Sequence, residues 1–98
     1  MKFSYKIFNN GNETLLAIAD KSILGKEYSK DGLVLVISND FYHQAFCSEE
    51  EALKMIENAT SVNAMGKGIV DILVKNNIIG ENNVLRPCGV PHAQIVKI

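Results

Sequence analysis

The sequence has little excess charge, no tryptophan, only two prolines and no long hydrophobic run, and several of these absences exclude a class of protein. Ten basic and eleven acidic residues leave a net charge of −1. The sequence therefore lacks the excess of basic residues that is typical of nucleic-acid-binding proteins, and no feature indicates DNA binding. Apolar runs such as residues 33–37 are far too short to span a bilayer. The first residues lack the hydrophobic region of a signal peptide. We therefore expect a cytoplasmic protein with no membrane partner.

The composition fits one folded domain over residues 1–98. A chain of this length buries roughly 65% of its extended surface on folding. Of its residues, 47% are hydrophobic, which is enough for one core without disulfides. The two cysteines, Cys47 and Cys88, are expected to stay reduced in the cytoplasm.

The first half of the chain is predicted to form strands. Apolar and polar residues alternate at positions 3–7, which is typical of a half-buried strand. The Asn and Gly residues at 9–12 favour a turn that leads into a returning strand at residues 14–19. Asp20 is expected to cap a short helical turn. Further extended segments are predicted at residues 26–29, at 33–38 as a fully buried strand, and at 41–46.

Two helices are predicted in the second half. Ser48 and Glu51 have the spacing of a capping box, in which each side chain binds the other residue's backbone amide. Apolar residues then recur at helical spacing to about Asn58. A second helix is predicted at residues 67–76, and a final strand at residues 94–98.

This order of elements indicates the α+β class. Strands first, helices later and a closing strand predict a two-layer sandwich, with a mostly antiparallel or mixed sheet and two main helices on one face. The core is predicted to include Ile18, Leu35, Val36 and Ile95, packed against the two helices.

The segment at residues 85–94 has the composition of a binding site. It holds both prolines, the only arginine, one of the two cysteines and one of the two histidines. Prolines fix φ and suppress regular structure. The segment is therefore expected to present Arg86, Cys88, His92 and Gln94 with little conformational entropy left to lose on binding.

Lys67 is a further candidate for binding. Residues 65–68 open the second predicted helix with two glycines, and free amides at a helix N-terminus can hold a phosphate. The stretch lacks the pattern of a P-loop, so a glycine-rich helix entry is the simpler interpretation. Arg86, Lys67, Lys75 and Lys97 together offer a modest positive face for weak, salt-dependent phosphate contacts. Scattered solvated lysines are the commoner explanation of such a set.

The cysteines and histidines form two pairs of mirrored spacing, His43 with Cys47 and Cys88 with His92. Two such pairs can supply the four ligands of zinc. The two side chains of each pair approach each other only if the chain turns between them. We therefore predict no metal site, and no cofactor. A Cys88–His92 pair also admits a thiolate nucleophile activated by imidazole. Spacing identifies no third residue to orient that pair. The simpler interpretation is that His92 hydrogen-bonds the backbone, and no catalytic residue is assigned.

Blocks along nearly the whole chain resemble the archaeal domain-of-unknown-function family 424. They are LLAIAD at 15–20, LGK at 24–26, GLVL at 32–35, FY at 41–42, SEEEA at 48–52, AT and VN at 59–63, and GVPHAQ at 89–94. The resemblance implies a small cytoplasmic archaeal protein with a two-layer α/β sandwich. It also implies that the genes of the family lie near genes of translation factors. It implies no enzymatic activity. His43 and Cys47 depart from the family pattern, which counts against a shared zinc site, whereas His92 and Gln94 match it.

The leading hypothesis is a non-enzymatic binding module that acts on an RNA or on a translation-associated protein. A rigid polar segment without a complete catalytic set favours it, together with what the resemblance implies. Two alternatives stay open. One is a small enzyme that uses Cys88 and His92, and the other is a structural subunit that self-associates through an exposed apolar patch.

Overall fold

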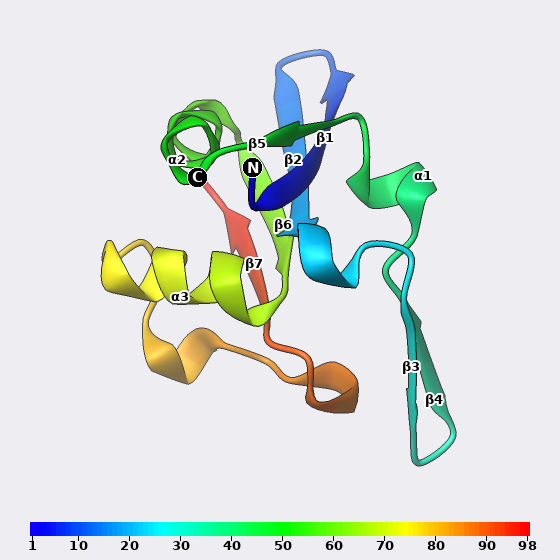
Figure 1. Cartoon of the computed structure of the whole chain (residues 1–98). Coiled ribbons are helices and arrows are strands. Elements are labelled where there is room, and N and C mark those ends of the chain that lie inside the picture. Colours follow the sequence, from blue (N-terminus) through cyan, green and yellow to red (C-terminus); the bar gives the residue numbers. More distant parts are fainter.

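The computed structural model describes residues 1–98 and contains a five-stranded sheet, a separate two-stranded hairpin and three α-helices (Figure 1). The strands of the sheet follow the order β5 (Ala45–Cys47), β1 (Phe3–Asn10), β2 (Glu13–Asp20), β6 (Ser61–Met65) and β7 (His92–Val96). Neighbouring strands are antiparallel except β2 and β6, which are parallel. The predicted α+β class with a mixed sheet is confirmed.

The hairpin of β1 and β2 forms where the alternating pattern predicts it. Its turn contains Gly11 at φ +62°, a conformation that glycine adopts without steric cost. The β2 strand lies in the middle of the sheet, and its residues Leu16, Ala17, Ile18 and Ala19 are fully buried. The predicted core residue Ile18 is therefore confirmed.

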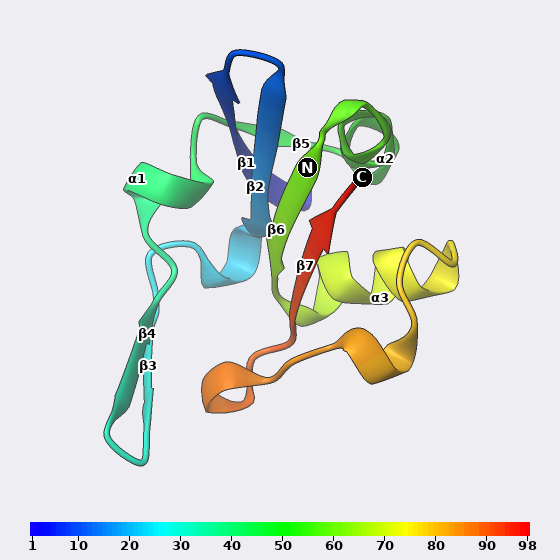
Figure 2. The same ribbon diagram turned by 180° about the vertical axis from the view of Figure 1, so that it is seen from behind.

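The two longer helices, α2 (Glu49–Asn58) and α3 (Lys67–Lys75), pack on one face of the sheet (Figures 1 and 2). The predicted capping box of α2 is present: Glu51 N donates to Ser48 Oγ at 3.2 Å, and Ser48 N donates to Glu51 Oε1 at 2.9 Å. No helix is long and apolar enough to cross a bilayer. The main core joins Phe3, Leu16, Ile18, Val62, Ala64 and Ala93 of the sheet to Ala52, Ile56, Ile69, Ile72 and Leu73 of the helices.

The opposite face of the sheet is covered by shorter elements. Helix α1 (Asn39–Tyr42) begins at Ser38, whose Oγ accepts a hydrogen bond from Phe41 N at 3.2 Å. The prediction of an extended segment at 41–46 is wrong for its first part, because this cap starts a helical turn. A second, smaller core lies on this face and contains Ala17, Ala19, Ile37, Tyr42, Met65 and Val90.

The prediction of a fully buried strand at 33–38 is wrong. Strand β4 (Leu33–Val36) pairs only with β3 (Glu27–Lys30), and the resulting hairpin projects from the body of the protein (Figure 1). Leu33, Val34 and Val36 are 64%, 63% and 49% exposed. Ile37 is the residue of this run that is fully buried.

Two of the predicted core residues, Leu35 and Val36, lie outside the main core. Ile95 is half-buried and packs against the main core, as expected. Leu35 packs instead against the smaller core on the other face, and Val36 belongs to neither. The hairpin pairs with no strand of the main sheet, so most of its apolar residues meet solvent.

Strand β6 has no counterpart among the predicted elements. It is five residues long, lies between α2 and α3, and pairs with both β2 and β7. The final strand occupies His92–Val96 and not residues 94–98, and Ile98 is fully exposed. A parallel β2–β6 pair requires a crossover, which the segment containing α2 provides.

Asp20 does not cap the short turn that follows it, contrary to expectation. The turn at Lys21–Ile23 has no side-chain cap. The Asp20 carboxylate instead accepts hydrogen bonds from Gly68 N and Ile69 N, each at 2.8 Å, at the start of α3. A Cβ atom at Gly66 would lie 2.6 Å from the Asp20 carboxyl carbon, and one at Gly68 would lie 2.9 Å from a carboxylate oxygen. The positive φ of Gly66 and this close contact together require glycine there, whereas a side chain at Gly68 would displace the Asp20 carboxylate.

We expect Gly66→Ala to destabilise the protein by about 1–3 kcal/mol, because Gly66 has φ +117° and its new Cβ would collide with Asp20. The measurement is urea unfolding followed by circular dichroism. Gly80→Ala is the matched control, since Gly80 has φ −89° and its nearest neighbour would lie 3.4 Å away. Equal unfolding midpoints for the two variants would contradict the proposed contact.

Candidate functional site

The predicted site segment is a loop that leaves and rejoins the edge of the sheet. Leu85 N donates to His92 O at 2.9 Å, and His92 N donates to Leu85 O at 2.8 Å. The loop between them contains a helical turn at Pro87–Gly89, which Pro87 begins. These two hydrogen bonds close the loop at its base, and Pro87 and Pro91 restrict it further.

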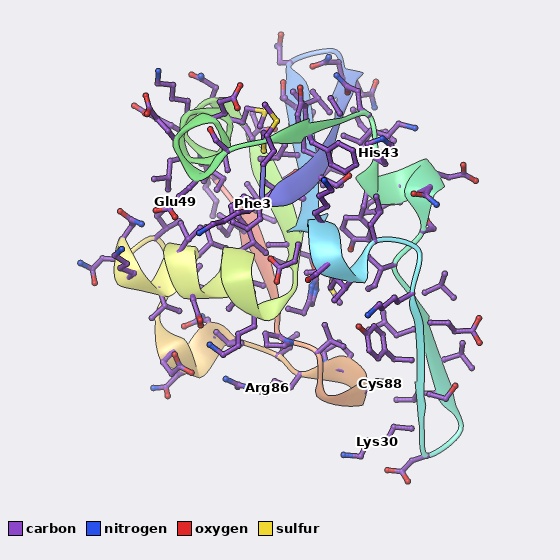
Figure 3. The ribbon with its side chains drawn as sticks, in the orientation of Figure 1. Phe3, Lys30, His43, Glu49, Arg86 and Cys88 are labelled. Carbon is purple, nitrogen blue, oxygen red and sulfur yellow. The ribbon has the colours of Figure 1, made fainter.

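The tip of this loop has an uncommon backbone conformation and lies against the β3–β4 hairpin (Figure 3). Cys88 has φ +51°, a left-handed conformation that few non-glycine residues adopt, and Gly89 follows at φ +81°. The Cys88 thiol donates to the carbonyl of Leu33 at 3.8 Å. The segment that the sequence singled out therefore contacts the projecting hairpin.

His92 fills the structural role that the sequence suggested. Its Nδ1 lies 2.9 Å from the carbonyl oxygen of Ala64 on β6. A carbonyl only accepts, so Nδ1 carries the hydrogen of this bond. Gln94, two residues along β7, is exposed and on the same face of the sheet.

The other two predicted binding residues are engaged elsewhere. Arg86 pairs with Glu81 at 3.1 Å, and Lys67 pairs with Asp71 one turn along α3 at 2.7 Å. None of the four cavities of the protein is lined by Arg86, His92, Gln94 or Lys67. The four residues do not form a common pocket.

The structure also gives less support to the positive face that the sequence suggested for phosphate contacts. Lys97 Nζ donates to the carbonyls of Ile56 and Glu57 at 2.6 and 2.9 Å. These carbonyls belong to the C-terminal turn of α2, where a cation is stabilising. With Lys67 and Arg86 also in ion pairs, three of the four positive groups already have partners.

The two mirrored Cys/His pairs are held by different contacts. Cys47 is buried on β5 opposite Phe3, and His43 Nδ1 lies 2.7 Å from the buried Ser4 Oγ. Cys88 and His92 bind the carbonyls of Leu33 and Ala64, as described above. No group of three or more His, Cys, Asp or Glu side chains is arranged to hold a metal ion.

The Ser4–His43 contact is structural. Ser4 is completely buried, and its hydroxyl donates to the carbonyl of Tyr42 at 2.8 Å. Because this uses the one hydroxyl hydrogen, His43 Nδ1 must donate to Ser4 Oγ. A base that activates a serine must accept its hydrogen, so the pair has the wrong polarity for nucleophilic catalysis.

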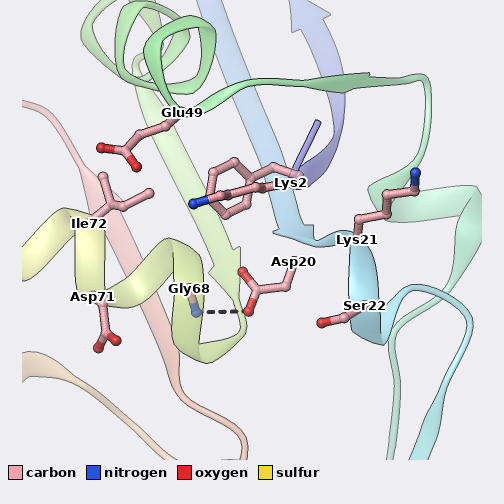
Figure 4. Close-up of a pocket in the computed structure, with 9 residues that line it drawn as sticks. Lys2, Asp20, Lys21, Ser22, Glu49, Gly68, Asp71 and Ile72 are labelled. Atoms are coloured by element: carbon pink, nitrogen blue, oxygen red, sulfur yellow. Dashed lines mark hydrogen bonds between the residues drawn. The ribbon is translucent and has the colours of Figure 1, made fainter.

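The largest cleft, of about 670 Å³, lies where the N-terminal ends of α2 and α3 approach the ends of β1 and β2 (Figure 4). Asp20 occupies one wall, and burial raises the pKa of its carboxyl group, against the opposing effect of its hydrogen bonds to Gly68 and Ile69. The first of these amides lies in the 65–68 stretch, which the sequence makes a candidate for binding phosphate. An internal carboxylate occupies the position, which agrees with the simpler interpretation of this stretch as a glycine-rich helix entry.

Sequence reasoning missed the exposed apolar side chains of β4. Leu33, Val34 and Val36 are all about half exposed or more, and they follow one another along a single projecting strand. The only sequence signal is the apolar run itself, for which the sequence predicts a buried strand. We call these three residues the β4 patch.

We expect one thiol, that of Cys88, to react with iodoacetamide in the native protein at pH 8. Cys47 is 1% exposed, and burial raises its pKa to about 11, which leaves about a thousandth of it as thiolate. Mass spectrometry should find one label on the native protein and two in denaturant, with native labelling abolished in Cys88→Ser. Two labels on the native protein would refute this, and very fast reaction of Cys88 would favour the enzyme alternative.

His92→Ala is expected to lower the free energy of unfolding by about 1 kcal/mol, through loss of the hydrogen bond to Ala64. Gln94→Ala is the matched control on the same strand, and a change within about 0.5 kcal/mol is expected there because Gln94 is exposed. Chemical denaturation of both variants measures the difference. A His92→Ala variant as stable as the wild type would remove the structural role assigned to the imidazole.

Comparison with known proteins gives a family and a fold. The chain superposes with a TM-score of 0.85 on the crystal structure of an uncharacterized conserved protein from Methanopyrus kandleri, at 26% sequence identity, over 100% of this chain and 95% of the other. None of the curated proteins matches. The family model described as "Protein of unknown function (DUF424)" matches residues 8–98. The chain therefore belongs to this family, as its sequence blocks indicated.

Proposed function

We propose that the protein is a non-enzymatic binding module that docks on a protein of the translation machinery through the β4 patch. The observation that carries this proposal is the exposure of Val34 and Val36, which lie two positions apart and so on one face of a projecting strand, with Leu33 exposed on the opposite face. Neighbouring exposed apolar side chains are typical of interaction sites, whereas single scattered ones are ordinary.

The distribution of charge favours a protein partner over an RNA. Binding to nucleic acid depends on lysine and arginine groups that are free to neutralise phosphates. Here Lys67 and Arg86 are in ion pairs and Lys97 binds the end of α2, while the net charge of the chain is −1. The β4 patch, by contrast, offers apolar surface.

The contacts of Cys88 and His92 favour binding over catalysis. Each side chain makes its hydrogen bond to a different backbone carbonyl, that of Leu33 for Cys88 and that of Ala64 for His92. A nucleophile and its base act through a hydrogen bond between them. The translation context comes from what the family resemblance implies.

We expect the wild-type protein to co-sediment with purified archaeal ribosomal subunits at low salt, and Val34→Glu to bind them at least about tenfold more weakly, since a buried charge replaces apolar contact. Val96→Glu is the matched control, because Val96 is 69% exposed on β7, outside the β4 patch. Centrifugation through sucrose with quantitative blotting measures both.

Three other results would redirect the proposal. Absence of binding to either subunit would overturn the translation role. Binding of total RNA by wild type and Val34→Glu alike would identify an RNA module. A dimer of the wild type in light scattering that becomes a monomer in Val34→Glu would identify a self-associating subunit.

A further inference from the structure

The outer edge of β4 has free backbone groups. The β3–β4 hairpin turns at Asp31 and Gly32, with φ +52° and +83°, and Lys30 pairs with Leu33 next to this two-residue turn. The pair flanking such a turn is hydrogen-bonded, and hydrogen-bonded pairs alternate along antiparallel strands. Val34 and Val36 therefore direct their N–H and C=O groups away from β3, to the side where no strand follows.

Side chains and backbone at this edge are exposed together. Val34 and Val36 lie on the same face of the hairpin, while Leu35 on the other face packs against the smaller core. No charged residue and no proline lies within β4. Such residues are the usual protection of an edge strand against pairing with another chain.

A polar hollow adjoins the base of this edge. It has a volume of about 290 Å³ and is lined by Gly25, Val36, Ser38, Asn39 and Asp40. The carboxylate of Asp40 takes part in none of the ion pairs of the protein. A strand that paired with β4 and continued past Val36 would meet this negative charge.

We propose that β4 receives an extended segment of the partner protein as a third strand. The segment carries two apolar residues, two positions apart, that contact Val34 and Val36, and a lysine or arginine that reaches Asp40. Its backbone bonds to the free N–H and C=O groups of Val34 and Val36, as in other cases of strand addition. This inference rests on the proposed docking of a protein at the β4 patch and specifies how it occurs.

A second copy of the chain fits this edge less well. Two β4 strands that paired with each other would place four residues of each copy in contact. A stable dimer buries about 20–30 residues on each side. A short segment that binds transiently, with a charge pair added at Asp40, needs no such area.

The test uses a phage-displayed library of random peptides, so it does not depend on the ribosomal experiment. The library is selected on the wild-type protein and depleted on Val34→Pro. Val34 directs its N–H outward, so proline there removes the edge donor and leaves the β3–β4 hydrogen bonds in place. We expect enriched peptides with two apolar residues separated by one position and a nearby lysine or arginine.

Fluorescence anisotropy of one enriched peptide then compares variants. We expect Val34→Pro to bind at least tenfold more weakly, and Val34→Thr, which keeps the backbone donor and the branched shape, to bind within about threefold of wild type. Asp40→Lys should weaken binding more than Asp40→Asn. If proline disrupts the hairpin, hydrogen exchange of the wild-type protein provides the test. Strand addition requires that the bound peptide slow the exchange of the Val34 and Val36 amides.

The opposing results are equally specific. Strand addition is overturned if no peptide remains enriched after depletion on Val34→Pro. It is also overturned if the bound peptide protects amides elsewhere than on β4 from hydrogen exchange. If Val34→Pro binds as well as wild type while Val34→Glu does not, the partner reads side chains only, and the docking proposal stands without strand addition. A wild-type dimer that Val34→Pro dissociates would assign the edge to a second copy.

Discussion

The hydrogen bonds between Asp20 and the first turn of α3 fix the relation of the central strand to the helical layer. Asp20 ends β2, and its carboxylate binds Gly68 N and Ile69 N, residues that follow directly on β6. The segment that begins α3 also contacts the loop at residues 85–92, because Gly66 N donates a hydrogen bond to Pro91 O at 2.8 Å. A negative charge at a helix N-terminus is favourable. The carboxylate therefore joins β2 to α3, and the backbone bond of Gly66 joins the same segment to the residue before β7. The position of the carboxylate also explains why a side chain at Gly66 or Gly68 would collide with Asp20.

Much of the fold follows from local sequence signals, and the errors arise where distant contacts decide the outcome. The β1–β2 hairpin, the capping box of α2 and the extent of α3 depend on residues close in sequence, and all three were predicted correctly. Strand β6 was missed because five residues give too short a pattern, and its pairing with β2 and β7 defines it. The sequence predicts Asp20 as the cap of the turn beside it, since nothing local indicates amides 48 and 49 residues away.

The candidate site was predicted less well, for a physical reason. Composition correctly singled out the 85–94 segment as restrained, but it could not say whether the restraint serves a ligand or the fold. A continuous apolar run such as β4 has the same sequence pattern in a core strand and in an exposed hairpin, because periodicity reports neither the neighbours nor the solvent. Whether the side chains of Val34 and Val36 meet solvent is decided by the absence of a core packed on their face of the hairpin, which is a property of the whole arrangement.

The two features are connected, because the restrained loop supports the exposed hairpin. An isolated two-stranded hairpin is marginally stable at best in water. Here Tyr28 and Leu35, opposite each other on β3 and β4, pack against the smaller core, and Cys88 contacts Leu33 from the tip of the loop. The left-handed conformation of Cys88 costs about 1–3 kcal/mol, and the backbone pairing of Leu85 with His92 helps to maintain it. A hairpin held in this way keeps its outer edge extended before a partner arrives, which reduces the entropy lost on binding.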